Sequence, residues 1–141
     1  MKIIQVVGRS NSGKTTFIRN LIPELKKKGK VGVIKHLGDH EFGLEPGKDT
    51  TFFFEAGADI TSGIDAQKTV MAIHNNALDE TLHAYLIYGI DFTVIEGYKE
   101  QEYAKIVIGT LEVDRCILKN PTIVEVIQSI DRFDDFLQYN E

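Results

Sequence analysis

Short apolar runs alternate with stretches of helical spacing along this chain. The β-branched run at residues 2–7 ends at Gly8, which is typical of a strand buried on both faces of a parallel sheet. Similar runs predict strands at 31–34 and 92–95. Apolar residues recur at helical spacing from Phe17 to Leu25, and three lysines with Gly29 follow. That pattern predicts a helix over 14–28.

The remainder of the chain continues the alternation. A short helix is expected over 49–56, with Asp49 as its cap and Gly57 at its end. Residues 60–64 and 69–73 predict a β-hairpin, because an Asp-Ala-Gln turn separates them. Further elements are expected as follows: a helix over 77–88, strands at 105–108 and 116–118 with Cys116 buried, and a closing helix that starts at Asn120-Pro121 and carries Ile123, Ile127, Ile130 and Leu137.

Composition narrows the classes of protein that fit. The 141 residues are 43% hydrophobic and 26% charged, so one globular domain over 1–141 is expected. A net charge of −5 disfavours binding to many nucleic-acid phosphates. The single cysteine cannot form an internal disulfide, no signal peptide layout is present, and no apolar run is long enough to span a membrane. We therefore expect a cytoplasmic protein with neither nucleic acid nor membrane as a partner.

One motif carries clear chemistry. Residues 8–15, Gly-Arg-Ser-Asn-Ser-Gly-Lys-Thr, fit G-x-x-x-x-G-K-[ST] between a predicted strand and a predicted helix, as a phosphate loop (P-loop, Walker A) requires. Gly8 and Gly13 allow successive backbone N–H groups to turn toward phosphate oxygens at the positive end of the helix. Lys14 would reach the β- and γ-phosphates, and the Thr15 hydroxyl would bind Mg²⁺. The predicted fold is a three-layer α/β sandwich of the phosphate-loop NTPase type, with a mostly parallel sheet and a β-hairpin insertion.

A nucleotide site also needs a carboxylate near the metal. Glu96 directly follows the run at 92–95, so it would lie at the carboxyl end of a strand beside the loop. Asp91 precedes the same run and would lie at the opposite edge of the sheet, so we reject it as the metal partner. Asp49 is either a helix cap or a residue that the long preceding loop brings to the Mg²⁺ or the γ-phosphate.

Other polar residues are weaker candidates. Lys35 and His36 leave the second strand at the edge of the phosphate loop, where contact with an anion is plausible. Together with Asp39 and His40 they form no zinc signature. Arg9 is read as a surface residue rather than as an arginine finger.

The ordered series of motifs resembles one known family. The matching residues are Gly8–Thr16, Ile34-Lys35-His36, Pro46–Thr50, Glu55–Ala58 and Val94–Lys99. Together they resemble the molybdopterin-guanine dinucleotide biosynthesis protein B (MobB) family, over about residues 1 to 110.

The resemblance implies a homodimeric GTP-binding protein with weak GTPase activity, which assists the molybdopterin guanylyltransferase MobA. It implies that Gly8, Gly13, Lys14, Thr15 and Thr16 serve the phosphates and Mg²⁺, with Arg9, Ser10, Asn11 and Ser12 completing the loop. Glu96 would be the acidic residue of the second nucleotide motif, and residues 46–49 would lie beside the site. Guanine preference rests on the resemblance, because residues 118–121, Leu-Lys-Asn-Pro, do not match the Asn-Lys-x-Asp signature.

The predicted function is therefore Mg²⁺-GTP binding in molybdenum cofactor maturation. If hydrolysis occurs, water attacks the γ-phosphate in line while the loop amides, Lys14 and Mg²⁺ stabilise the charge, and Lys14 and Glu96 are the candidate catalytic residues. Two alternatives stay open. The chain could be a small-molecule kinase or ATP-dependent ligase on the same fold, or a binding module that nucleotide switches and in which hydrolysis is incidental.

Overall fold

Residues 1–137 are described by the computed structural model and divide into two compact units. The first unit combines Met1–Leu37 with the chain from Asp79 onward, and the second unit is Gly38–Leu78. The second unit thus interrupts the first in sequence. A single phosphate-loop domain over 1–141 stays a prediction.

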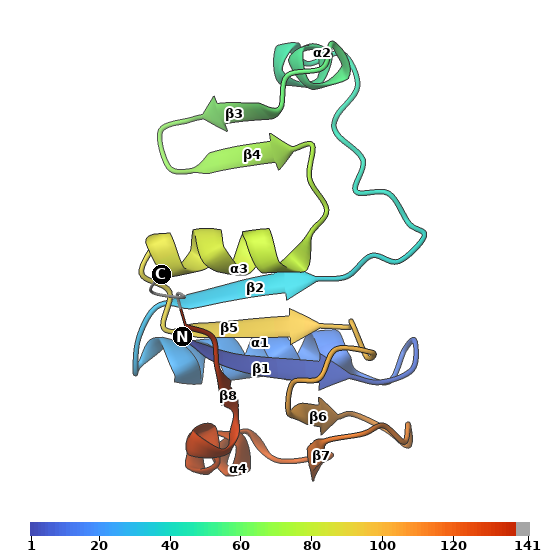
Figure 1. The fold of residues 1–141 in the computed structure, drawn as a ribbon, viewed down its shortest axis with the longest axis vertical. Helices are drawn as coiled ribbons and strands as arrows, with labels where there is room; N and C mark the ends of the chain where they lie inside the picture. The colour runs from blue at the N-terminus through green and yellow to red at the C-terminus, as the bar shows by residue number, and fades with distance from the viewer. Residues whose placement is uncertain (138–141) are drawn as a thin grey trace. The chain divides into compact units, whose positions relative to one another are not determined.

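The first unit is built on a mostly parallel sheet, as predicted (Figure 1). Its strands run in the order β2-β5-β1-β6-β7, and each neighbouring pair is parallel. Because β6 pairs only with Gln5–Val7, the amino-terminal half of β1 is free on that side, and β8 pairs antiparallel with it there. The strands are β1 (Lys2–Val7), β2 (Val31–Lys35), β5 (Phe92–Glu96), β6 (Lys105–Val107), β7 (Cys116–Lys119) and β8 (Asp134–Asp135).

Helices lie on both faces of this sheet. Ile4 and Val94 face α1 (Lys14–Lys26) and α4 (Ile123–Gln128), whose buried side chains complete one apolar core. On the opposite face, the Tyr85 ring of α3 (Leu78–Ile87) covers Gly32, where a Cβ would lie 2.5 Å from the ring. The three predicted layers are therefore present. No helix within residues 1–137 is long and apolar enough to cross a bilayer.

The second unit contains α2 (Asp49–Glu55) and the predicted hairpin of β3 (Ile60–Ile64) and β4 (Thr69–Ile73). The prediction that Asp49 caps its helix was wrong. The cap is Lys48, in extended conformation and without a side-chain bond, and its carbonyl accepts the first backbone bonds of the helix. Asp49 is the first helical residue, a position where a negative carboxylate is stabilised by the positive end of the helix dipole.

The predicted closing helix is shorter than expected and begins later. Thr122 and Glu125 form a capping box, so α4 starts after Asn120-Pro121 and covers only six residues. A 3₁₀ turn, Ile130–Arg132, follows, and β8 then pairs with the free part of β1. Leu137 is exposed and not helical. The chain therefore does not continue as a helix but pairs, as β8, with the free amino-terminal half of β1.

Cys116 begins β7 as predicted, but it is exposed rather than buried. β7 is the last strand in the order of the sheet and has β6 as its neighbour. An outer strand of this kind leaves side chains accessible to solvent, which explains the difference.

Candidate functional site

The predicted phosphate loop connects β1 to α1 at the carboxyl edge of the sheet. Asn11 and Gly13 have left-handed backbone conformations, with φ of 60° and 99°. A Cβ at Gly8 would lie 2.4 Å from the Ile108 carbonyl oxygen and 2.7 Å from Ser12 Oγ. Gly8 is thus required because the backbone packs closely against it, and Gly13 because its backbone conformation is left-handed. The loop lies between a strand and a helix, as the motif requires.

Hydrogen-bond donors gather in this loop. The first backbone bond of α1 runs from Phe17 N to Gly13 O at 3.0 Å, and the N–H groups before it precede the helical ladder. Lys14 Nζ folds back and donates to the carbonyl oxygens of Gly8 and Arg9, both at 2.8 Å. Ser12 Oγ is buried without a partner among the described residues. A phosphate fits this set of donors, because backbone amides, an ammonium and a hydroxyl all favour a compact anion.

Thr15 and Thr16 open α1 beside Lys14 and are exposed, as are Arg9 and Ser10 in the loop. The exposure of Arg9 agrees with its interpretation as a surface residue, and its part in nucleotide binding stays a prediction. The Thr15 hydroxyl is therefore accessible to a ligand at the loop, a requirement for its predicted role toward Mg²⁺.

The structure brings Glu96 and Lys35 together at the same edge. Glu96 ends β5, and its backbone is in register with Lys35 of β2 on one side and Val6 of β1 on the other. Lys35 Nζ lies 3.6 Å from Glu96 Oε1, and the carboxylate side chain is only 13% exposed. Asp91 is at the opposite end of β5, where it accepts a bond from Lys30 N at 2.7 Å, as predicted.

His36 is engaged by an aromatic neighbour. Its ring stacks on Tyr98 with centroids 4.1 Å apart. Gly97, which precedes Tyr98, has φ of 95°, and a Cβ there would lie 3.1 Å from His36 Cβ. Asp39, His40 and Asp49 belong to the second unit, so their part in the site stays a prediction. Within residues 1–137 no three His, Cys, Asp or Glu side chains are grouped to hold a metal ion.

The late loop contains no free guanine-reading amide at Asn120. Its Oδ1 accepts from Gly109 N at 2.7 Å, and its Nδ2 donates to Gly109 O at 2.9 Å. Both polar atoms of the Asn120 side chain thus bind the backbone of Gly109. The preceding residue, Ile108, contacts the phosphate loop, because its carbonyl oxygen packs against Gly8.

Two residues near this edge were missed from sequence. Gln5 interrupts the apolar run of β1, and Lys105 precedes the apolar run of β6, yet both are almost fully buried. A polar residue inside a predicted buried strand was the available signal, since most such groups are buried with hydrogen-bond partners. Gln5 Nε2 has two partners, whereas its Oε1 is buried with none among the described residues.

Comparison with known proteins places the chain among proteins of one biosynthetic system. The family model for molybdopterin guanine dinucleotide synthesis protein B (MobB) matches residues 3–129. A probable molybdopterin-guanine dinucleotide biosynthesis adapter protein of Bacillus subtilis (strain 168) is 36% identical over 132 residues, covering 89% of this chain and 75% of that protein. The adapter protein of Escherichia coli (strain K12) is 33% identical over 106 residues, covering 70% and 60%.

Solved structures agree on the fold. The crystal structure of Bacillus subtilis MobB superposes with a TM-score of 0.72 and 26% identity, covering 95% of this chain and 99% of that one. A MobB homolog from Bacillus stearothermophilus has a TM-score of 0.61 at 20% identity, with 94% of each chain covered. The latter likeness supports the fold alone.

Proposed function

This chain belongs to the molybdopterin-guanine dinucleotide synthesis protein B (MobB) family, and on that premise we propose that it is an adapter protein that binds Mg²⁺-GTP. The observation that carries the proposal is the meeting of the phosphate loop with Lys35 and Glu96 at the carboxyl edge of β1, β2 and β5. Neighbouring parallel strands with a helix amino terminus form the usual position of a nucleotide in such sheets.

Each residue has a distinct task in this proposal. The backbone amides of residues 8–13 surround the phosphates, and the Lys14 ammonium exchanges the Gly8 and Arg9 carbonyls for phosphate oxygens. The hydroxyls of Thr15 and Thr16 and the Glu96 carboxylate would hold Mg²⁺ and its water shell. The metal, when bound, neutralises charge on the β- and γ-phosphates. Lys35 keeps a positive charge beside Glu96.

Slow hydrolysis is part of the proposal. A fast GTPase orients the attacking water with a positioned side chain, often a glutamine. Gln5 is paired in register with Ile95, the residue before Glu96, and it already donates to the carbonyl oxygens of Gly97 and Tyr98, at 2.8 and 2.5 Å. A side chain committed to the backbone in this way is a poor water-positioning group.

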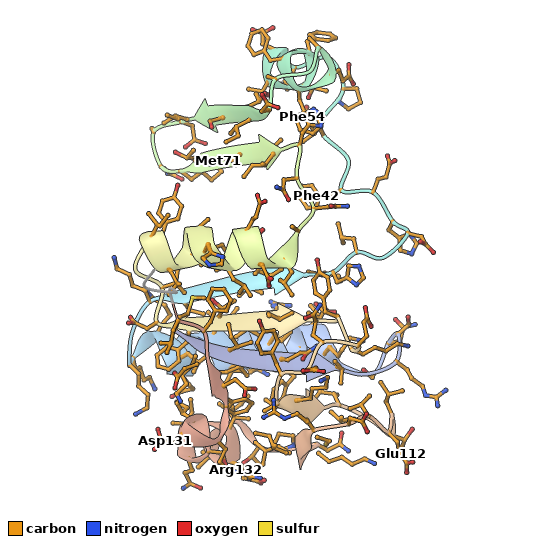
Figure 2. All side chains as sticks on the ribbon, viewed as in Figure 1. Phe42, Phe54, Met71, Glu112, Asp131 and Arg132 are labelled. Atoms are coloured by element: carbon orange, nitrogen blue, oxygen red, sulfur yellow. The ribbon has the colours of Figure 1, made fainter. Side chains whose placement is uncertain are left out.

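We further propose a homodimer that assists the guanylyltransferase MobA in the cytoplasm. The second unit has many exposed large apolar side chains for its size, including Phe42 and Met71, which are labelled in Figure 2. Surfaces of this kind are typical of protein interfaces. The set is Phe42, Phe52, Phe53, Ile60, Ile64, Val70, Met71 and Ile73.

Calorimetric titration of GTP and ATP, with and without Mg²⁺, tests the nucleotide proposal. The native chain should bind Mg²⁺-GTP, and Lys14→Ala should lose at least about tenfold in affinity because the phosphates lose a charged partner. Lys27→Ala is the matched control, since this α1 capping lysine only pairs with Glu24 on the helix surface. Absence of nucleotide binding, or native affinity in Lys14→Ala, would overturn the proposal. A preference for ATP would favour the kinase or ligase alternative.

A further inference from the structure

The connection between β5 and β6 is unusual for parallel strands. β5 and β6 flank β1, and only eight residues, 97–104, join them without a helix. Parallel strands usually need a dozen or more residues, with a helix that satisfies its own backbone. The carbonyl groups of this short crossover that are shielded from water therefore need donors from elsewhere.

Side chains from the sheet supply those donors. Gln5 of β1 and Lys105 of β6 are in register, so they point to the same face. Gln5 Nε2 donates to Gly97 O at 2.8 Å and to Tyr98 O at 2.5 Å. Lys105 Nζ donates to Gln101 O, and to Tyr103 O at 2.8 Å. The pair thus binds four carbonyl groups of one crossover.

Burying the polar side chains of Gln5 and Lys105 costs desolvation free energy, which only their hydrogen bonds to the crossover offset. Gln5 is 0% and Lys105 2% exposed. Burial, and after it the charge of Arg115, lowers the pKa of Lys105, and no described carboxylate lies within ion-pair distance of its ammonium. Apolar side chains would fill the same space without a desolvation cost, but they would remove these side-chain donors from the crossover. Tyr98 O would keep only its backbone bond from Gln101 N, at 2.9 Å.

The crossover begins with the turn that follows the acidic residue of the site. Gly97 N donates to Val6 O at 3.0 Å, while Gln5 donates to the Gly97 carbonyl, so β1 holds both backbone polar groups of this residue. Tyr98 has a left-handed backbone, φ 53°, which is strained for a residue with a side chain. β1 is also the strand that leads into the phosphate loop. One strand therefore holds both halves of the candidate site.

We propose that Gln5 and Lys105 are positioning residues, which fix crossover 97–104 from beneath and thereby set Glu96 against the phosphate loop. The effect of this positioning on ligand affinity rests on the proposed binding of Mg²⁺-GTP. The fixing of the crossover itself stands independently of any nucleotide.

Lys105→Met tests the inference, with Lys2→Met as the matched control. Lys2 lies on β1, the strand of Gln5, and like Lys105 it donates to a backbone carbonyl, Phe133 O at 3.2 Å. It does so at the amino end of the strand, where it also pairs with Asp135 at 3.2 Å. Amide hydrogen exchange in the absence of nucleotide should show loss of protection at 97–104 in Lys105→Met and not in Lys2→Met. Affinity for Mg²⁺-GTP should fall about tenfold in Lys105→Met alone. Gln5→Met gives the same reading if Lys105→Met does not fold.

A double-mutant cycle with Glu96→Gln separates positioning from general destabilisation. If Lys105 acts through Glu96, the combined loss of affinity is smaller than the product of the two single losses, whereas Lys2→Met with Glu96→Gln is additive. The inference would be overturned if the affinity losses of Lys105→Met and Glu96→Gln simply multiplied in the double variant. It would also be overturned if hydrogen exchange at 97–104 were unchanged in Lys105→Met. Failure of the native chain to bind Mg²⁺-GTP would overturn the proposed function instead, and the exchange result would still decide whether the crossover is fixed by this pair.

Discussion

Lys35 Nζ lies 3.6 Å from Glu96 Oε1, across adjacent carboxyl ends of β2 and β5. The lysine side chain is 54% exposed, whereas the glutamate side chain is largely covered. An ion pair with one exposed partner adds little to stability, about 0–1 kcal/mol. Its placement beside the phosphate loop is therefore more relevant to ligand binding than to folding.

Glu96→Gln should weaken Mg²⁺-dependent GTP binding by about tenfold or more, because an amide replaces a carboxylate at the proposed metal. The melting temperature should change little. Calorimetry at several Mg²⁺ concentrations measures the first effect and thermal unfolding measures the second. Asp65→Asn breaks a different lysine pair, the exposed one with Lys68 in the hairpin turn, and should leave binding unchanged. Equal effects from both variants would argue against a metal role for Glu96.

Gly8→Ala should damage both stability and nucleotide binding. The added Cβ meets Ile108 O at 2.4 Å and Ser12 Oγ at 2.7 Å, so the loop must shift at a cost of about 1–3 kcal/mol. Urea unfolding and calorimetry measure the two effects. Gly43→Ala is the control, because a Cβ there meets nothing within 4 Å and the backbone φ is not positive. A native-like Gly8→Ala would show that the loop is not constrained at this point.

Acid should weaken the first unit through Asp134. Burial raises the pKa of this carboxyl, but hydrogen bonds from Ala104 N and Arg115, with the Arg115 charge, outweigh burial and lower the pKa below its usual range. Because the folded pKa is the lower one, the stabilisation is complete above about pH 4 and is lost as pH falls through the folded value.

Asp134→Asn should therefore cost about 1 kcal/mol at pH 7, and the gap from the native chain should narrow at pH 3. Urea unfolding at both pH values measures the gap. Asp131→Asn, an exposed substitution in the 3₁₀ turn, should be neutral at both. A gap that is constant with pH would contradict the ionic contribution of Asp134.

Ile64→Glu should dissociate the proposed homodimer. Ile64 ends β3 and is 79% exposed, and a carboxylate in an apolar interface is costly to desolvate. Sedimentation velocity should give a dimer for the native chain and a monomer for the variant. Ile87→Glu is the control, since Ile87 of α3 is 83% exposed but lies outside the second unit. Dimers in both variants would exclude an interface at this end of the hairpin.

Much of the fold was predictable because its signals are local. The β-branched runs, the Gly-Lys-Thr start of α1 and the Asp65 turn each act within a few residues. The errors concern non-local effects. Residues 134–135 became a strand because a distant strand, β1, had an unpaired edge, and no helical periodicity in residues 123–137 contains that information.

The candidate site shows the same division. Lys14 and Glu96 could be proposed as site residues because motif spacing and strand ends are visible in sequence. Gln5 and Lys105 were not identified, because their importance depends on a crossover that lies above them in three dimensions. In the sequence, the only sign of such a role was a polar residue within an apolar run. A single residue of this kind does not show which group it binds.

The position of β1 in the sheet also affects when the chain can fold during synthesis. β1 is made before all its partners, and these begin at residues 92, 105 and 134. The central strand must therefore wait, unpaired, until most of the chain has left the ribosome. The hairpin of residues 60–73 pairs only with itself and can form much earlier. Slow translation before residue 92 would thus prolong the exposure of an apolar strand, whereas slow translation after residue 73 would not delay the hairpin.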